Sequence, residues 1–242
     1  MRELWVPLSG AIAQQRQVET IANNVANANT HGYKRLDVQF EELVSRPKTH
    51  ATASYVTDRG LFVDFETGSF ENTHNPLDLA INGEGFFAIQ VGETVQYTRK
   101  GQFLLSADGT LVTPSGHTVL DNAGAPIQVP QDATNIMVAR DGTISSADGA
   151  IAQVGLFSFA DEDLNKLQRT GDSNFLPQLG AAAVPVEAPS MRQGMLESSN
   201  VNAVQEMVTM QDVSKKYQNA LKLMQGLEEL ETRAIQTLGK YQ

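Results

Sequence analysis

The C-terminal end of the sequence carries an apolar stripe that suits one long, uninterrupted helix. From about residue 202 to 240, apolar residues follow one another at steps of three or four, the spacing of one face of an α-helix. This stretch contains no proline, and Asn202 followed by Gln205 resembles a capping box at its start. At about 1.5 Å per residue, the helix would be roughly 55 Å long. The stripe consists of Ala203, Met207, Met210, Val213, Tyr217, Leu221, Met224, Leu227, Leu230, Ala234 and Leu238.

The N-terminal end carries a second apolar seam. Its members are spaced 4-3-4-3-4-3, a period of 3.5 residues, and Gln15 is its one polar member. Pro7 lies near the start, where a helix tolerates proline. Gly32 follows a run of polar residues, which suits a helix stop with glycine in a left-handed conformation. The seam consists of Leu4, Leu8, Ala11, Gln15, Val18, Ala22 and Val25.

The middle of the chain, about 61–195, has the pattern of many short β-strands. Apolar runs are separated by turn pairs in which glycine follows asparagine, aspartate or serine and supplies a positive φ angle. Close spacing of short strands favours an irregular sandwich or barrel with mostly antiparallel pairing. The apolar runs are 61–65, 77–81, 86–91, 102–105, 136–139 and 152–159.

These patterns predict four parts: an N-terminal helix with its signature over 1–44, a linker over 45–60 without periodicity, a β-rich domain over 61–195 and a C-terminal helix over 196–242. The expected fold class is mainly β with long terminal helices (α+β). Neither helical stripe can remain in water, so we expect the two helices to pair into a coiled-coil-like core, with each other, with neighbouring copies, or with both. An alternative is that both helices fold back onto one globular core.

Composition argues against several classes of function. The balance of 18 basic against 28 acidic residues gives 18 − 28 = −10, which disfavours binding to a phosphate backbone. No apolar run approaches the ~20 residues that a transmembrane helix needs, so direct membrane insertion is not expected. The N-terminal apolar run is short and its flanking Arg2 and Glu3 cancel, so a cleaved signal peptide is not expected either.

No motif indicates catalysis. The four histidines are scattered among turn residues and form no metal-binding spacing. The segment 83–85 lacks the third glycine of a dinucleotide site, and 108–110 and 141–143 lack the preceding aspartate of a phosphatase motif. We therefore expect no enzyme activity, no metal, no cofactor and no small-molecule substrate.

Three segments, in the right order, closely resemble the signatures of flagellar basal-body rod and hook proteins. They are residues 9–35, residues 75–87 with the sequence Tyr97-Thr98-Arg99 and Gly101 that follows, and residues 197–207. The compact middle of the chain, the segment Pro126-Ile127-Gln128-Val129-Pro130 and the form of 199–204 most resemble the proximal-rod members. His31 stands where the family often has proline, and Lys216-Tyr217-Gln218 stands where it usually has Arg-aromatic-Glu.

The resemblance implies a structural subunit of the proximal rod in the bacterial flagellar basal body. Such subunits pass through the flagellar type III export apparatus without a cleaved signal, and their terminal helices pack into a tubular core in the periplasm. Expected partners are other rod proteins and copies of the same chain. Alternatives are a distal-rod or hook-type axial subunit, a dimeric soluble module whose β domain binds a ligand, and a hydrolase with an unrecognised site.

The expected subunit interface combines both ends of the chain. The apolar residues of the N-terminal seam are expected to pack against the C-terminal stripe, within a subunit and between neighbours. The asparagine amides either bond to backbone and fix the register, or merely mark a frayed helix end. The N-terminal interface residues are Leu4, Leu8, Val18, Asn23, Asn24, Val25, Asn27, Asn29 and Gly32. The C-terminal ones are Asn200, Val201, Asn202, Val204, Met207, Tyr217, Leu221 and Met224.

Overall fold

The computed structural model describes residues 5–45, 53–133 and 135–238, which fall into two compact units. The first, which we call the terminal unit, combines residues 1–28, 35–64 and 201–242. The second, which we call the β unit, combines residues 29–34 with 65–200. The chain is therefore mixed α and β, with a helix near each end and a β-rich middle, as the sequence predicts.

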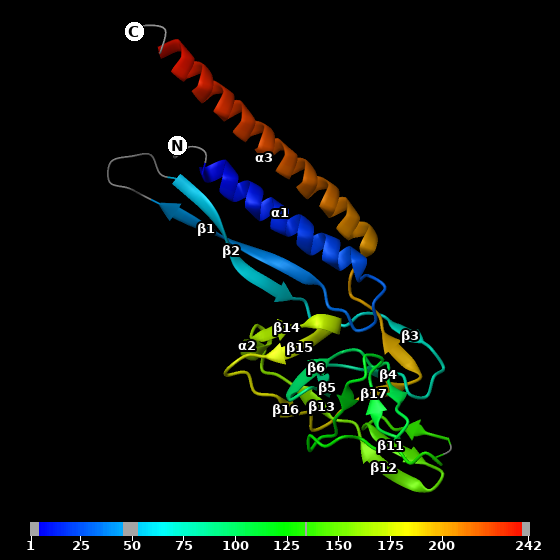
Figure 1. Ribbon diagram of the computed structural model, residues 1–242. Helices are drawn as coiled ribbons and strands as arrows, with labels where there is room; N and C mark the ends of the chain where they lie inside the picture. Colours follow the sequence, from blue (N-terminus) through cyan, green and yellow to red (C-terminus); the bar gives the residue numbers. More distant parts are fainter. Residues whose placement is uncertain (1–4, 46–52, 134, 239–242) are drawn as a thin grey trace. The chain divides into compact units, whose positions relative to one another are not determined.

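The terminal unit contains α1 (Trp5–Ala26), α3 (Ala203–Leu238) and a hairpin of β1 (Leu36–Ser45) and β2 (Ala53–Val63). Helix α1 runs antiparallel to α3 and contacts it on one side, and the hairpin contacts α1 on another side (Figure 1). Because α1 has 22 residues and α3 has 36, the C-terminal part of α3 extends beyond α1 (Figure 1).

The buried face of α1 differs from the predicted seam. Ala11 is buried as predicted, but Ile21 and Ala13 are buried as well, whereas Ala22 is exposed. A strict period of 3.5 describes a helix with one partner. Helix α1 is covered by both α3 and the hairpin, so its buried arc is wider and follows the ordinary helical repeat.

The linker predicted over 45–60 is wrong where the chain is described. Residues 53–60 belong to β2, which pairs antiparallel with β1 from Leu36↔Val63 to Ser45↔Ala53. The segment lacks apolar alternation but contains the β-formers Tyr55, Val56 and Thr57, and hairpin pairing needs only backbone groups. Residues 46–52 lie outside the described part.

The β unit consists of short strands and two short helical turns. All of its strand pairs are antiparallel, and its largest sheet follows the order β14-β15-β6-β5-β9-β8-β7. The elements are β3 (Phe70–Asn72), β4 (Leu79–Ile81), β5 (Phe86–Val91), β6 (Thr94–Thr98), β7 (Leu104–Leu105), β8 (Leu111–Val112), β9 (Thr118–Val119), β10 (Met137–Val138), β11 (Thr143–Ser146), β12 (Gly149–Gln153), β13 (Leu156–Ser158), α2 (Asp161–Leu164), β14 (Leu167–Arg169), η1 (Gly171–Ser173), β15 (Asn174–Pro177), β16 (Val184–Pro185), β17 (Met191–Gln193) and β18 (Met195–Glu197).

Strand β5 runs through the core of this unit. Phe87 is fully buried and meets Phe103 edge to face, with ring centroids 5.1 Å apart. On the other face of β5, Phe86 packs against Phe65 and Phe175, with ring centroids 5.5 and 5.7 Å apart. The last strands of the chain, β17 and β18, pair with the early strands β4 and β3. The β unit is therefore closed by segments from both ends of its sequence.

Candidate functional site

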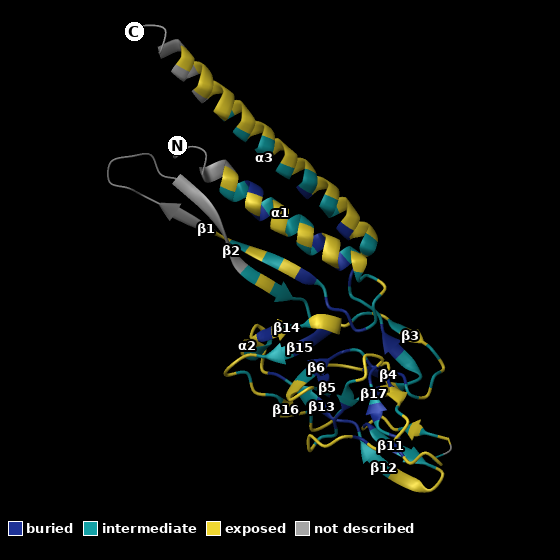
Figure 2. Cartoon of the chain, in the orientation of Figure 1, coloured by how far each residue is buried: buried dark blue, intermediate teal, exposed yellow. Residues whose placement is uncertain are grey.

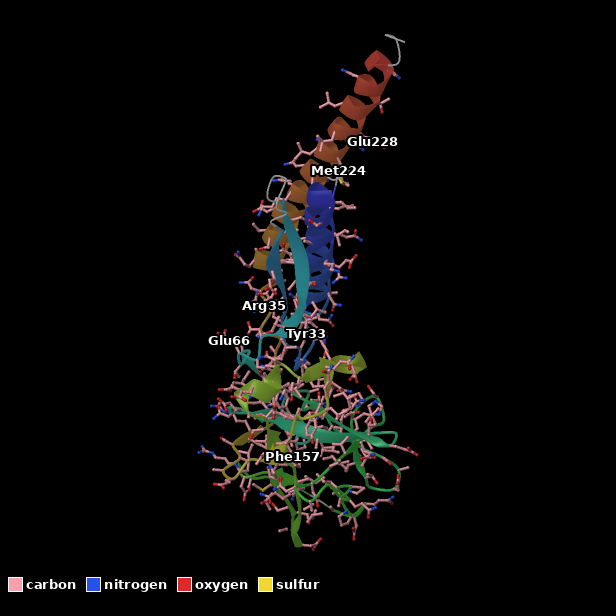
Figure 3. All side chains as sticks on the ribbon, turned by 90° about the vertical axis from the view of Figure 1, so that its left-hand side faces the viewer. Tyr33, Arg35, Glu66, Phe157, Met224 and Glu228 are labelled. Atoms are coloured by element: carbon pink, nitrogen blue, oxygen red, sulfur yellow. The ribbon has the colours of Figure 1, made fainter. Side chains whose placement is uncertain are left out.

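One face of α3 packs within the terminal unit. Val213 is 3% exposed, and Tyr217, Leu221 and Met224 are half-buried at helical spacing. These residues follow the predicted stripe. Met224 and Glu228 are labelled on the extended part of α3 in Figure 3.

A second set of apolar side chains on α3 is exposed. Val204 is 72% exposed, and the relative exposures of Leu223 and Leu230 are 66% and 62%. At 100° per residue these three positions, with Val208, lie within about 100° of one another, and the centre of the set is about 125° around the helix from Val213. Figure 2 shows that the part of α3 beyond α1 is mostly exposed where it is described. A helix with apolar residues on two faces is typical of one that is buried more fully in an assembly.

The predicted C-terminal interface residues therefore separate into groups. Val201 is buried, while Val204 and Met207 are exposed. Asn202 is exposed and caps α3, because its Oδ1 accepts a hydrogen bond of 3.2 Å from the Gln205 N–H, which confirms the predicted capping role. Asn200 lies in the β unit, where its side-chain amide donates to the Glu66 carbonyl at 3.2 Å.

The asparagines at the end of α1 make specific hydrogen bonds. Asn24 is buried, and its side chain donates to the Leu36 carbonyl at 2.8 Å and accepts from the Leu36 N–H at 2.9 Å. It thereby fixes the start of β1 against the end of α1. Asn27 donates to the Asn23 carbonyl at 2.8 Å across one helical turn.

The other predicted N-terminal residues are less uniform. Val18 and Val25 are half-buried, Leu8 is 37% exposed and Asn29 is exposed, and Leu4 lies outside the described residues. Gly32 has a positive φ, of 68°, as predicted, but it does not form the helix stop, because α1 already ends at Ala26. Its N–H donates to the Glu197 carbonyl at 2.8 Å, and a Cβ placed on it would lie 2.5 Å from the Lys100 nitrogen. Gly32 is therefore a close-approach position in the β unit.

A buried cluster of three charges, which we call the hub, joins distant segments of the β unit. Its members are Lys34, Arg99 and Glu197, whose side chains are 1%, 4% and 1% exposed. Lys34 Nζ lies 2.7 Å from Glu197 Oε1, and Arg99 NH1 lies 3.3 Å from Glu197 Oε2. Burial of two such pairs is costly unless the remaining donors and acceptors are satisfied as well.

Backbone groups provide most of the additional hydrogen bonds of the hub. Lys34 Nζ also donates to the carbonyls of Phe65 and Glu66, at 3.3 and 2.6 Å. Glu197 Oε1 accepts a hydrogen bond from the Gly68 N–H at 3.1 Å, and Arg99 NH2 donates one to the Gly83 carbonyl at 2.8 Å. Burial lowers the pKa of Arg99, and the nearby carboxylate of Glu197 opposes that shift.

The hub contains two cations and one carboxylate. Glu197 is the shared partner, so each cation depends on it, whereas either cation can be removed and still leave one neutral pair. Loss of the Glu197 carboxylate is therefore expected to destabilise the β unit more than loss of either cation.

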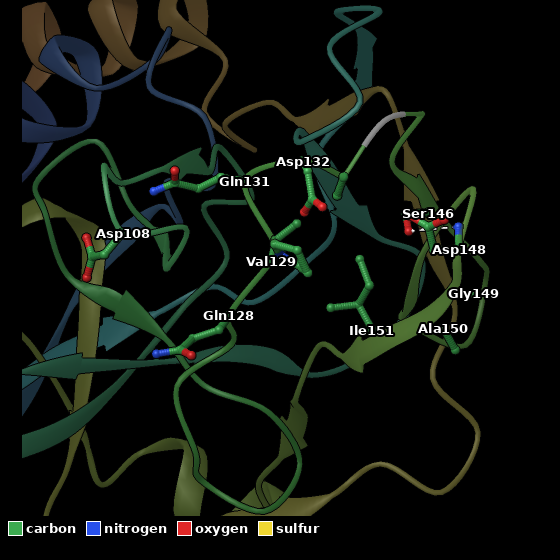
Figure 4. Close-up of a pocket in the computed structure, with 12 residues that line it drawn as sticks. Asp108, Gln128, Val129, Gln131, Asp132, Ser146, Asp148, Gly149, Ala150 and Ile151 are labelled. Carbon is green, nitrogen blue, oxygen red and sulfur yellow. Dashed lines mark hydrogen bonds between the residues drawn. The ribbon is translucent and has the colours of Figure 1, made fainter.

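The pocket in Figure 4 carries no recognisable chemistry. It has a volume of about 660 Å³ and is lined about equally by polar and apolar residues of the β unit, with Asp108, Gln131, Asp132 and Asp148 among the polar ones. The Asp108 carboxylate is tied to its own turn by the hydroxyl of Ser106, which lowers its pKa. Over residues 5–45, 53–133 and 135–238, no group of three or more histidine or carboxylate side chains is placed to hold a metal ion. In the same part of the chain, no helix is long and apolar enough to cross a membrane.

Comparison with known proteins matches three successive regions of the chain. Residues 6–34 match the flagella basal body rod protein family, residues 80–146 the flagellar hook protein FlgE/F/G D1 domain, and residues 192–237 the flagellar basal body rod FlgEFG protein C-terminal region. The flagellar basal-body rod protein FlgF of Caulobacter vibrioides is 34% identical to this chain, and the alignment covers 98% of both. FlgF of Rhizobium meliloti is 36% identical over 98% of this chain and 97% of its own. The basal-body rod protein FlgG of Bacillus subtilis is 31% identical over 95% and 96%.

The chain belongs to the flagellar basal-body rod protein family. Each of the three matched regions of this basal-body rod protein contributes one residue to the hub. Lys34 comes from the first region, Arg99 from the second and Glu197 from the third. The sequence signatures of the family therefore meet in one place in the β unit.

Sequence reasoning did not select the hub residues as a site. All three stand within the signature segments, but each segment contains other charged residues as well, so nothing in the sequence singled these three out. Lys34 and Glu197 are 163 residues apart, and no local periodicity relates their positions.

Proposed function

We propose that this chain is a structural subunit of the flagellar basal-body rod that assembles with copies of itself and with other axial proteins. The observation that carries the proposal is the second apolar face of α3, formed by Val204, Val208, Leu223 and Leu230, in a chain whose relatives are rod proteins. Burying one such side chain contributes about 1.5–3 kcal/mol, so repeated contacts along a tube would stabilise an assembly strongly. As a basal-body rod protein, the chain is structural and not an enzyme.

The terminal helices are proposed to form the assembly core. In the assembled rod, α1 and α3 would pair in a coiled-coil-like manner, and the exposed face of α3 would lie against a neighbouring subunit. The β-rich middle would form an outer layer. This assignment rests on the antiparallel packing of α1 and α3 and on the length of α3 beyond α1.

The proximal rod is the position we favour. The FlgF relatives reported above are 34% and 36% identical, whereas the FlgG relative is 31% identical. The corresponding location is the periplasmic rod, reached through the flagellar type III export apparatus. A distal-rod or hook-type subunit remains the alternative within the family.

A charge in the helix interface tests the proposal. Leu221→Asp places a carboxylate on the half-buried face of α3, where it opposes packing, so rods containing this variant should not form and motility should be lost. The measurement is the recovery of the variant in purified basal bodies, with amide exchange of the β unit showing that this unit stays folded.

Gln225→Asp is the matched control, because it adds the same charge one turn later at an exposed position that lies about 115° around the helix from the centre of the exposed apolar face. It should be recovered in basal bodies at the wild-type level. Normal incorporation of Leu221→Asp would contradict the assignment of this face. A complex that stops growing at two copies as concentration rises would instead indicate the dimeric module.

A further inference from the structure

Residues 29–34 hold an unusual place in the chain. They belong to the β unit, yet the residues before and after them, up to 28 and from 35 to 64, belong to the terminal unit. Withdrawal of this segment from the β unit would therefore leave the rest of that unit, residues 65–200, as one continuous chain. We call residues 29–34 the peg.

The peg is held in the β unit by three kinds of contact. Tyr33 is fully buried, and the guanidinium of Arg169 lies 4.1 Å from its ring centroid. Gly32 lies against the backbone of Lys100 and donates its N–H to the Glu197 carbonyl. Lys34 supplies the hub bonds to Glu197 and to the carbonyls of Phe65 and Glu66.

Lys34 thereby binds both ends of the continuous β-unit chain. Phe65 and Glu66 are its first residues, and Glu197 lies close to its last. The two ends also meet directly, because Glu197 accepts from the Gly68 N–H and Ser198 donates its N–H to the Ser69 carbonyl at 2.8 Å. We call these two ends, residues 65–72 and 193–200, the neck. Tyr33 and Glu66 are labelled in Figure 3.

We propose that the peg is a removable latch, fastened by Lys34, whose docking couples the conformation of the terminal unit to closure of the neck. When the peg is docked, the single ammonium of Lys34 links both ends of the neck. When the peg withdraws, Glu197 keeps Arg99 as its partner, so β18 stays against the core around β5 and β6, while residues 65–72, with β3, separate from β18. A change in the terminal unit that displaces residue 28 or 35 acts directly on this equilibrium. The proposal does not depend on the function proposed above.

Hydrogen exchange followed by mass spectrometry on the full chain tests the latch. In Lys34→Met, amides of the neck should exchange at least about tenfold faster, because three charge-assisted bonds are lost. Amides of β5 and β6 should exchange at the wild-type rate. Lys166→Met is the matched control, since its ion pair with Asp163 is solvent-exposed and far from the hub in sequence, and it should change neither region.

The wild-type protein supplies a second measurement that does not depend on the variant folding. In low concentrations of denaturant, amides of the peg and of the neck should share one opening event, at a lower free energy than β5 and β6. Unchanged exchange of the neck in Lys34→Met would overturn the proposal. An equal rise of the exchange rate in β5 and β6 would also overturn it, because Lys34 would then stabilise the unit only as a whole. Separate opening events for the peg and the neck in the wild type would overturn it as well, because docking of the peg would then not control closure of the neck.

Discussion

Glu197→Gln is expected to destabilise the β unit by about 3–5 kcal/mol, the cost of leaving buried charges without their partner. The substitution preserves the shape of the side chain but removes the one carboxylate that Lys34 and Arg99 share in the hub. The two buried cations then lose their shared carboxylate and keep backbone carbonyls, an amide oxygen and, for Arg99, the ring of Phe86. The free energy of unfolding should be measured from the denaturant dependence of amide exchange in β5 and β6.

The ranking of the variants by their loss of stability is as informative as the size of each loss. Lys34→Met should cost the β-unit core less than Glu197→Gln, because it leaves Arg99 and Glu197 as a neutral pair. Glu187→Gln, at an exposed position of the same unit, should change the free energy of unfolding by no more than about 0.5 kcal/mol. If Glu197→Gln cost no more than Lys34→Met, the charge balance assigned to the hub would be incorrect.

Gly32→Ala is expected to destabilise the docked peg, and with it the neck, by about 3 kcal/mol, through backbone strain and steric overlap together. The φ angle of 68° is unfavourable for alanine, and the added methyl group would meet the Lys100 nitrogen at 2.5 Å. That neighbour is backbone and cannot rotate away. Thermal and chemical unfolding of the full chain, with amide exchange in the neck as the readout, would measure this loss of stability.

Gly116→Ala separates the two causes. Gly116 also has a positive φ, of 83°, but a Cβ there would meet nothing within 4 Å. This control should therefore show the strain alone, about 1 kcal/mol. Equal losses in the two variants would mean that the close approach of Gly32 to residue 100 contributes nothing.

The periodic elements were predictable because their signal is local. The stripe over 203–238 predicted α3, including its Asn202 cap, and the glycine-containing turns predicted a middle of short antiparallel strands. The face of α1 was only partly predictable. Its buried arc depends on the β1–β2 hairpin, and the sequence of that hairpin was interpreted as a linker.

The sites were harder to predict than the elements. Asn24 was selected for its polarity at the end of a helix, and its two bonds to Leu36 show that it fixes a strand to that helix. Val204 and Met207 belong to the predicted C-terminal interface but are exposed in the single chain. The hub was missed because ion pairs between residues 34, 99 and 197 depend on the tertiary fold and on no spacing along the chain.

Electron microscopy of basal bodies, purified from cells that make this chain and reconstructed at near-atomic resolution, tests the central claim most directly. We expect density for the chain in the rod, with α1 and α3 in the tube wall and with Val204, Leu223 and Leu230 covered by neighbouring subunits. Complete rods that lack the chain, or a chain bound with these three side chains facing solvent, would contradict the account.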